Sequence, residues 1–375
     1  MKKTARKPWL LLSASLFLLV SCSLDVFSLP EAVPKYIFLF IGDGMGANHI
    51  EAARQYADST EAIGEGYVPL RFDDFPATGM ARTHNYWGGL TDSAASATAI
   101  ASGKKTSNGV INMNPCTTKS FTPITELMKA KGRKVGIVSS GSLDSATPAA
   151  FYASAPSRND NYDIALQLAN GAFDFFGGGN LSDPLGASDA QTSVFEIAQN
   201  NGFTIADTKA EILALTPSDV PALAVSSSTS LPYLIENNAS DPTLAEFTRA
   251  AIDLLDGDGG FFIMAESAKI DSASHAGDIM RMIPEVMALD EAIAEAFAFY
   301  GEHPDETLIV VTSDHETGGL TIADGEGFDY TRFSWTTGSH TGQDVRVFAL
   351  GVGQEIFEGN YDNTGIFKRL EVMLE

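Results

Sequence analysis

Cysteine is almost absent from this sequence, which has only two, Cys22 and Cys116, in 375 residues. A disulfide-stapled scaffold needs several cysteine pairs, so that class of protein is excluded. The fold must be held by a hydrophobic core, to which 44% of the residues can contribute, and by any metal that the protein binds. We expect Cys116 to be an inert thiol.

Basic residues are also scarce. Lys and Arg number 24 against 48 Asp and Glu, and the formal net charge is −24. This balance argues against nucleic acid or an anionic membrane surface as the main partner, because both bind basic surfaces. An acidic protein also repels anionic substrates at long range. Local cations would have to hold such a substrate, and metal ions are the obvious source.

No hydrophobic run is long enough to cross a bilayer, which takes about 20 residues. The apolar run Trp9–Val20 follows a basic start and precedes Ser21 and Cys22, an order typical of a secretory signal. It resembles a bacterial lipoprotein signal, in which the cysteine becomes the lipid-bearing N-terminus. We therefore predict that residues 1–22 are a signal peptide and that the protein is exported to the periplasm or cell envelope with a lipid on Cys22. An ordinary signal peptide cut before Leu29 is the alternative.

Short apolar runs alternate with amphipathic segments along the rest of the chain. We expect buried strands at Tyr36–Ile41, Lys134–Ser139, Gly259–Ala265, Thr307–Thr312 and Arg346–Gly351. We expect helices at Ser93–Ala101, Ile124–Lys131, Asn161–Ala169, Val194–Asn200, Pro242–Leu255, Phe367–Leu374 and, most clearly, Ile283–Tyr300. This alternation predicts an α/β fold with a mostly parallel central sheet and helices on both faces. Active residues in such folds gather at the carboxyl ends of strands.

The domain organisation is predicted to be simple, with a linker over residues 23–35 and one domain over residues 36–375. There is no internal repeat and no long low-complexity tract. Residues 181–241 are richer in Ser, Asp and Pro and weaker in strand signals, so we expect an excursion from the sheet there.

Two short motifs place chemistry beside the predicted elements. Gly42-Asp43-Gly44-Met45-Gly46 puts a carboxylate at the end of the first strand, although an Asp between glycines is also a common turn former. In Thr91–Ala99, Ser93 stands at the start of a helix rich in small residues. Ser93 or its neighbours could merely cap that helix. A helix N-terminus is also an anion site, where a Ser hydroxyl could attack phosphorus.

Further carboxylates and imidazoles follow later strands. Glu266, Asp271 and His275 come after one strand, Asp314 and His315 after another, and His340 lies beside glycines. Such a set suits two ions such as zinc, while an all-oxygen set suits magnesium. We interpret the remaining histidines as surface or packing residues: His49, His84 and His303.

These residues resemble those of the alkaline phosphatase family, in the bacterial form with short insertions. The resemblance runs in matching order across about residues 36–355. Its segments are Ile41–Gly46, Thr91–Ala99, Ala146–Ala150, Glu266–His275, Ser313–Gly319 and Thr337–Gly342. It implies an alkaline phosphatase-like three-layer sandwich and the hydrolysis of small phosphate monoesters through a phosphoserine, releasing inorganic phosphate and an alcohol.

The resemblance also implies roles for individual residues. Ser93 would be the nucleophile and Arg158 would clamp the phosphate. Asp271, His275 and His340 would hold one Zn²⁺, and Asp43, Asp314 and His315 a second. Asp43, Thr147 and Glu266 would hold one Mg²⁺. A homodimer is also implied. On its own, Arg158 could be a surface residue, and Thr147 beside a proline could be a helix start.

Two positions depart from the family's pattern, and other functions remain open. Ser145 stands where members commonly have Asp or His, and Ser272 where they usually have Lys, His or Trp, which affects expectations for magnesium affinity, pH optimum and product release. The alternatives are a phosphodiesterase or sulfatase of the same superfamily, or a non-catalytic surface lipoprotein that binds metal or phosphate. Sulfatases mature a Cys or Ser followed by x-Pro-x-Arg, whereas Ser93 is followed by Ala-Ala-Ser.

Overall fold

The computed structural model describes residues 30, 32–59, 69–186, 188, 190–325 and 327–374. The predicted signal segment and Cys22 lie outside these residues. Among the helices in the described ranges, none combines the length and the apolar character needed to cross a membrane.

A ten-stranded sheet forms the centre of the molecule, in the order β14-β2-β13-β8-β1-β7-β3-β4-β6-β5. Its strands are β1 (Tyr36–Gly42), β2 (Ala77–Arg82), β3 (Lys134–Ser142), β4 (Phe175–Gly179), β5 (Thr204–Ala206), β6 (Ala222–Val225), β7 (Phe261–Ser267), β8 (Thr307–Thr312), β13 (Val345–Gly351) and β14 (Gly359–Asp362). Neighbouring strands are parallel except at β13, which is antiparallel to both β2 and β8. Two small hairpins lie outside this sheet: β9 (Glu316–Thr317) with β12 (His340–Thr341), and β10 (Leu320–Ile322) with β11 (Phe333–Trp335).

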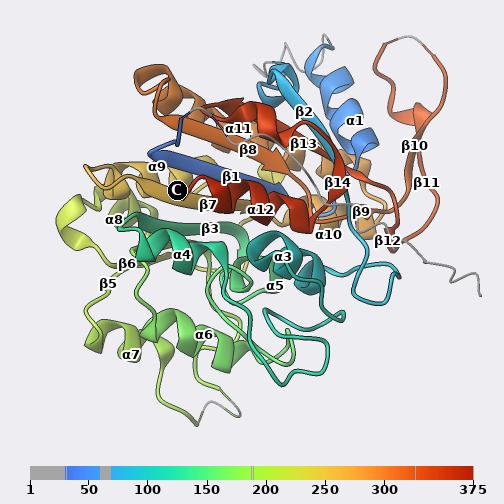
Figure 1. Ribbon diagram of the computed structural model, residues 1–375. Coiled ribbons are helices and arrows are strands. Elements are labelled where there is room, and N and C mark those ends of the chain that lie inside the picture. Colours follow the sequence, from blue (N-terminus) through green and yellow to red (C-terminus); the bar gives the residue numbers. More distant parts are fainter. Residues whose placement is uncertain are drawn as a thin grey trace, which may run out of the picture.

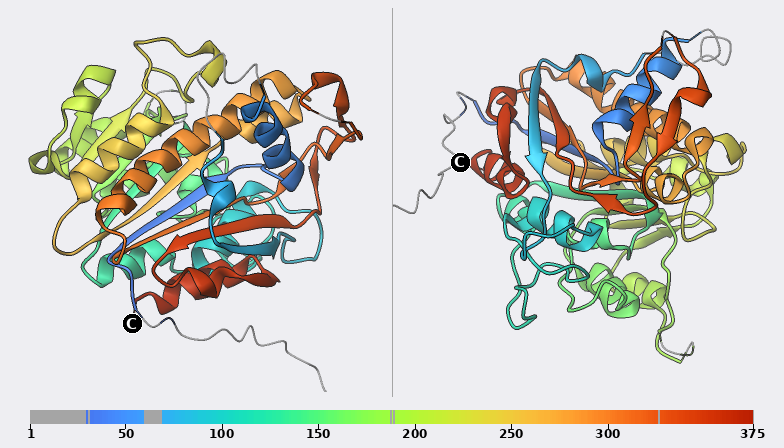
Figure 2. Two further views of the ribbon diagram at one scale, coloured as in Figure 1. Left: turned by 90° about the horizontal axis from the view of Figure 1, so that it is seen from above. Right: turned by 90° about the vertical axis from the view of Figure 1, so that its right-hand side faces the viewer.

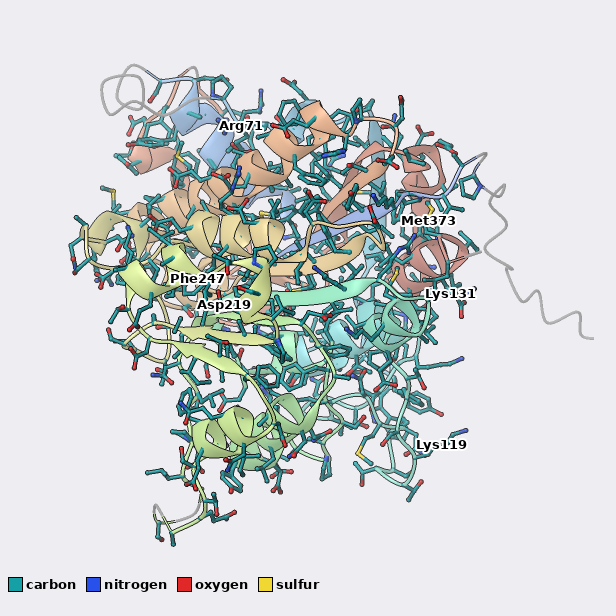
Figure 3. The ribbon with its side chains drawn as sticks, turned by 90° about the vertical axis from the view of Figure 1, so that its left-hand side faces the viewer. Arg71, Lys119, Lys131, Asp219, Phe247 and Met373 are labelled. Atoms are coloured by element: carbon teal, nitrogen blue, oxygen red, sulfur yellow. The ribbon has the colours of Figure 1, made fainter. Side chains whose placement is uncertain are left out.

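Helices cover both faces of the sheet (Figures 1 and 2), which confirms the predicted fold class. One face carries α3 (Ser93–Ser102), α4 (Ile124–Ala130), α5 (Ala146–Ala149), α6 (Asn161–Asn170), α7 (Val194–Asn200) and α12 (Thr364–Val372). The other carries α1 (Ala47–Ala57), α8 (Lys209–Ala214), α9 (Leu244–Leu255), α10 (Lys269–His275) and α11 (Ile279–Glu302). Each face has its own core; Figure 3 labels Met373 in the first and Phe247 in the second.

The five predicted strands and seven predicted helices all form, with small differences at their ends. The central strands read as continuous apolar runs because helices bury both of their faces. On α11, Phe297 faces solvent and is 43% exposed. Phe299 takes the inward position instead and packs its ring edge-on against Tyr36 and Phe38.

The prediction of an excursion from the sheet over residues 181–241 is wrong, because this segment contributes two short strands to the central sheet. It supplies β5 and β6, which pair in parallel with each other at one edge, and β6 also pairs with β4. The helices α7 and α8 flank these strands along the chain.

Three adjacent strands in the middle of the sheet end side by side. In register, Ile41 of β1 lies beside Glu266 of β7 on one side and Thr312 of β8 on the other. The residues that follow these strands therefore meet at one edge of the sheet. This edge holds Asp43 after β1, α10 after β7, and Asp314 after β8.

Candidate functional site

Three buried side chains meet at the carboxyl edge of the sheet. Nε2 of His315 lies 3.5 Å from Oδ1 of Asp43 and 3.2 Å from Oδ2 of Asp314. Neither carboxylate oxygen has a hydrogen-bond partner. Burial raises the pKa of Asp43 well above its usual value, and the nearby carboxylates of Asp314, Asp271 and Glu266 raise it further. Buried, unpartnered carboxylate oxygens are costly unless a cation lies between them.

The protonation of His315 fits the same interpretation. Its Nδ1 lies 3.2 Å from the hydroxyl of Thr317, which itself donates to Asp271. Nδ1 must therefore donate, and Nε2 carries a lone pair. Burial lowers the pKa of His315, so the ring is neutral near pH 7. The Nε2 lone pair and the two carboxylate oxygens are acceptors that face one another, and a divalent cation suits this donor set.

A second group lies next to the first and is built from Asp271, His275 and His340. Nε2 of His275 is 3.1 Å from Nε2 of His340 and 3.3 Å from Oδ2 of Asp271. Both rings donate from Nδ1 to a backbone carbonyl, His275 to Gly338 at 2.8 Å and His340 to Thr91 at 2.8 Å. The hydrogen bond to Asp271 raises the pKa of His275 to about 9, so without an ion Nε2 of His275 holds a proton between Asp271 and His340. A divalent ion would take the place of that proton, and both Nε2 atoms would then be acceptors that face it. They are arranged as ligands of a common ion.

The two groups of proposed ligands adjoin each other. The rings of His315 and His340 stack with centroids 3.6 Å apart, and ligand atoms of Asp271, His315 and His340 also lie within 4.8 Å of one another. His275 is the most exposed of the three imidazoles, with 39% of its side chain accessible. One edge of the combined site is therefore open to solvent.

Ser93 lies against the first group from the N-terminus of α3. Its Oγ is 3.2 Å from Nε2 of His315, and the residue is 4% exposed. Asp92 caps the helix by accepting from the backbone N–H of Ala95 at 3.0 Å. Apart from Ile100, the remaining residues of α3 are small, and all of them are buried, which lets the helix approach the sheet closely.

Arg158 is held beside the same helix end. Its Nη1 donates to Oδ2 of Asp92 at 3.2 Å, and its backbone N–H donates to the carbonyl of Gly109 at 2.7 Å. The side chain is 35% exposed, so the guanidinium remains accessible from solvent. Its planar fork can bind two oxygens of a phosphate next to the Ser93 hydroxyl.

Glu266 and Thr147 are two further buried polar residues proposed for the site. Burial raises the pKa of Glu266 to about 7, and its carboxylate accepts from the hydroxyl of Ser139. The hydroxyl of Thr147 on α5 is buried without a hydrogen-bond partner. In the described part of the chain, carboxylate and imidazole ligand atoms gather around Asp43, Asp271, Asp314, His315 and His340, and Glu266 is not among them. The magnesium site proposed for Glu266 and Thr147 therefore stays a prediction.

Gly44 connects the two groups through its backbone. Its N–H donates to Oδ1 of Asp314 at 3.1 Å. Its φ is +75°, and a Cβ there would lie 2.9 Å from Cα of Asp271. Only glycine combines this conformation with so close an approach. The glycine after Asp43 is therefore required by the site, whereas the sequence alone also allows an ordinary turn.

His49 is a supporting residue whose contacts the sequence does not reveal. It is fully buried on α1, where Nδ1 accepts from the N–H of Gly46 at 3.2 Å and Nε2 lies 3.0 Å from the hydroxyl of Ser274. That hydroxyl donates to the carbonyl of Ile270, so Nε2 of His49 must donate. A neutral His49 thus satisfies both ring nitrogens and braces α10 one residue before His275.

The His49→Gln substitution is expected to flatten the acid side of the stability profile. Burial lowers the pKa of His49 to about 4, below the value of about 6.5 in the unfolded chain. The unfolded state therefore binds more protons between these values, and stability falls as the pH drops from about 6.5 to about 4, by up to about 3 kcal/mol. Denaturant unfolding at several pH values measures this slope. An unchanged slope in His49→Gln would contradict the assignment.

The fold and the site together define a metal-dependent hydrolase. Two adjacent groups of carboxylates and imidazoles can each bind a cation, and a serine lies against one of them. Comparisons with known proteins narrow this class. The family model described as Alkaline phosphatase matches residues 34–334 and 328–375. Alkaline phosphatase of Escherichia coli (strain K12) is 31% identical over 419 residues, which cover 92% of this chain and 87% of that protein. Alkaline phosphatase 3 of Bacillus subtilis is 28% identical, over 90% of this chain and 88% of that protein.

Other relatives differ in length. The chain matches alkaline phosphatase 4 of Drosophila melanogaster at 34% identity but spans only 56% of that protein. Among solved structures, alkaline phosphatase from the Antarctic bacterium TAB5 has a TM-score of 0.81 and 32% identity, with 91% of this chain and 98% of that chain covered. A variant of that enzyme was solved with Mg bound.

This chain belongs to the alkaline phosphatase family. It is a phosphoric monoester hydrolase, and its grouped carboxylates and imidazoles are those of a metal-binding enzyme.

Proposed function

We propose that the chain hydrolyses small phosphate monoesters through a phosphoserine on Ser93, with two Zn²⁺ and one Mg²⁺ per chain. The observation that carries this proposal is the 3.2 Å approach of the Ser93 hydroxyl to Nε2 of His315, which itself faces two unpartnered carboxylate oxygens. A hydroxyl that merely capped its helix would have no reason to lie in this cluster.

The side chains divide into three ligand sets. Asp271, His275 and His340 would hold one zinc, and Asp43, Asp314 and His315 the other. Asp43, Thr147 and Glu266 would hold magnesium, which suits their oxygen donors. When bound, such ions lower the pKa of a nearby hydroxyl and neutralise the charge that develops on a departing alkoxide.

The protein's own groups account for positioning. Arg158 holds two phosphate oxygens at the N-terminus of α3, where the helix dipole also favours negative charge. Oγ of Ser93 loses its proton to solvent and forms a bond to phosphorus while the bond from phosphorus to the alcohol oxygen breaks. That oxygen takes up a proton from solvent, and the alcohol leaves. Water then attacks the phosphoserine, and inorganic phosphate is released with the Ser93 hydroxyl restored.

Trapping the covalent intermediate tests this proposal. The protein is mixed with a monoester carrying radioactive phosphate, quenched in acid and digested. The label is expected on the peptide that contains Ser93, because a phosphoserine survives acid. Ser102→Ala, the same substitution at the far end of α3, should still be labelled, whereas Ser93→Ala should not. Label on another residue, or turnover with no labelled peptide at any quench time, would overturn the covalent route.

We infer that the whole protein is exported, with residues 1–22 as signal peptide, residues 23–35 as linker and residues 36–375 as one domain. The basic start, the apolar run Trp9–Val20 and the Cys22 that follows support a lipid anchor in the cell envelope. We also infer a homodimer, from family membership. The acidic net charge supports small esters rather than nucleic acid as substrates.

A further inference from the structure

The loop that leads into α3 carries the most exposed aromatic side chain in the described part of the molecule. Trp87 is 73% exposed, and its neighbours Tyr86 and Leu90 are 52% and 53% exposed. The rings of Tyr86 and Trp87 meet edge to face with centroids 5.0 Å apart. Three exposed apolar side chains thus occupy the segment just before Ser93, where they contribute nothing to the cores.

This loop is held in place by hydrogen bonds. The side chain of Asn85 accepts from the N–H groups of Trp87 and Gly89 at 3.0 and 3.1 Å and donates to the carbonyl of Leu90 at 3.0 Å. Nε1 of Trp87 donates to the hydroxyl of Ser107 at 3.0 Å. A fixed aromatic ring in solvent can bind a partner with little further loss of conformational entropy.

Trp87 lies on the phosphate-clamp side of the site. Ser107, its hydrogen-bond partner, is two residues before Gly109. The N–H of Gly109 donates to Asp92 at 2.8 Å, and its carbonyl accepts from the backbone of Arg158. The Trp87 ring is therefore tied to the same short segment that places Arg158 and the cap of α3.

Leu90, at the other end of this loop, lies near the second ligand group. A cavity of about 380 Å³ is lined by Leu90, Thr91, Thr341 and Gly342, among others. Thr91 accepts the hydrogen bond from His340, so this cavity adjoins the second ligand group. The loop therefore reaches from the Arg158 side to the His340 side.

We propose that Trp87, with Tyr86 and Leu90, binds the leaving group of the substrate and that it favours a planar aromatic or heteroaromatic one. The inference rests on the proposed function, because a phosphate held by Ser93 and Arg158 fixes where the rest of the ester must lie. Ser93 is almost fully buried, so only the phosphoryl group can reach it. The alcohol part of the ester stays outside this buried position, beside the loop.

The test compares an aromatic with an aliphatic monoester. For Trp87→Ala, kcat/KM for 1-naphthyl phosphate is expected to fall about tenfold, mainly through KM, since stacking on an aromatic side chain is lost. Activity on glycerol phosphate should change by less than about twofold, and so should inhibition by inorganic phosphate. Trp87→Phe should restore much of the aromatic preference, and Leu90→Ala should weaken it independently.

Phe297→Ala is the matched control, because it removes another exposed aromatic ring. Phe297 lies near the end of α11 that leads into the start of β8, at the edge of the sheet opposite the site. It should leave both kcat/KM values unchanged. Equal losses on the two esters in Trp87→Ala, or no loss on either, would overturn the leaving-group assignment.

Two further measurements distinguish this inference from a contact between copies of the chain and from the proposed covalent route. A change in native mass in Trp87→Ala would overturn it in favour of a contact between copies of the chain. Failure of the covalent route would instead show as missing label on Ser93 while the naphthyl preference still depended on Trp87. The two proposals can therefore fail separately.

Discussion

Replacing Ser93 with alanine is expected to lower kcat/KM for phosphate monoesters by at least about 10³-fold while the bound metal stays the same. The change removes the oxygen that would bond to phosphorus. The Ser93 hydroxyl lies against Nε2 of His315, and its removal leaves all of the proposed ligands in place. Alanine is also favoured in a helix, and α3 should remain intact. Steady-state kinetics and metal analysis on the same preparation measure both outcomes.

Ser102→Ala provides the matched control for this prediction. Ser102 is buried on the same helix, where its hydroxyl donates to the carbonyl of Thr98 at 2.7 Å. It is more than two helical turns from Ser93, so activity should stay within about twofold of the wild type. Residual turnover in Ser93→Ala would come from the remaining cations and Arg158. Activity close to the wild-type value would remove Ser93 from the reaction.

The central strands could be predicted from the sequence because their burial leaves a local signal. β1, β7 and β8 read as apolar runs, since helices cover both faces of the sheet. β4 gives no such signal, although all five of its residues are buried. It reads Phe-Phe-Gly-Gly-Gly, and a Cβ at Gly178 would lie 2.0 Å from the carbonyl oxygen of Ser139 in the neighbouring strand. Its glycines are explained by a neighbour that is distant in sequence.

Some residues of the candidate site could likewise be predicted from the sequence, and others could not. Asp43, Ser93 and Asp314 could be proposed because each directly follows a strand or begins a helix, and such positions meet at one edge of a parallel sheet. His49 could not be assigned a supporting role, because its partner Ser274 is 225 residues away. The exposure of Trp87 also depends on long-range packing. Motif patterns locate the side chains that we propose as ion ligands, whereas residues that brace or flank the site emerge only from the folded chain.

The Asp43→Asn substitution is expected to have opposite effects with and without metal. In the metal-loaded enzyme it removes a proposed charged ligand, so activity should fall by at least about 100-fold and metal content should drop. In the stripped protein it should raise the midpoint of thermal unfolding by a few degrees. The reason is the cost of a buried charge: burial raises the pKa of Asp43 well above its usual value, and repulsion from Asp314, Asp271 and Glu266 raises it further. An amide relieves that repulsion and keeps the shape of the side chain.

Thermal unfolding with chelator and with added zinc and magnesium separates the two effects. The matched control is Asp290→Asn, which alters a buried carboxylate that does have a cationic partner. Asp290 accepts from Nη1 of Arg71 at 2.8 Å and from the backbone of Arg71 at 2.7 Å. Burial raises the pKa of Asp290 too, but the hydrogen bonds from Arg71 oppose that shift. An amide there would turn an NH2 donor toward the Arg71 guanidinium, so the substitution should destabilise the protein in both conditions. If Asp43→Asn also lowered the unfolding midpoint in chelator, Asp43 would be a structural carboxylate with a favourable partner. The carboxylate cluster would then not be a cation site.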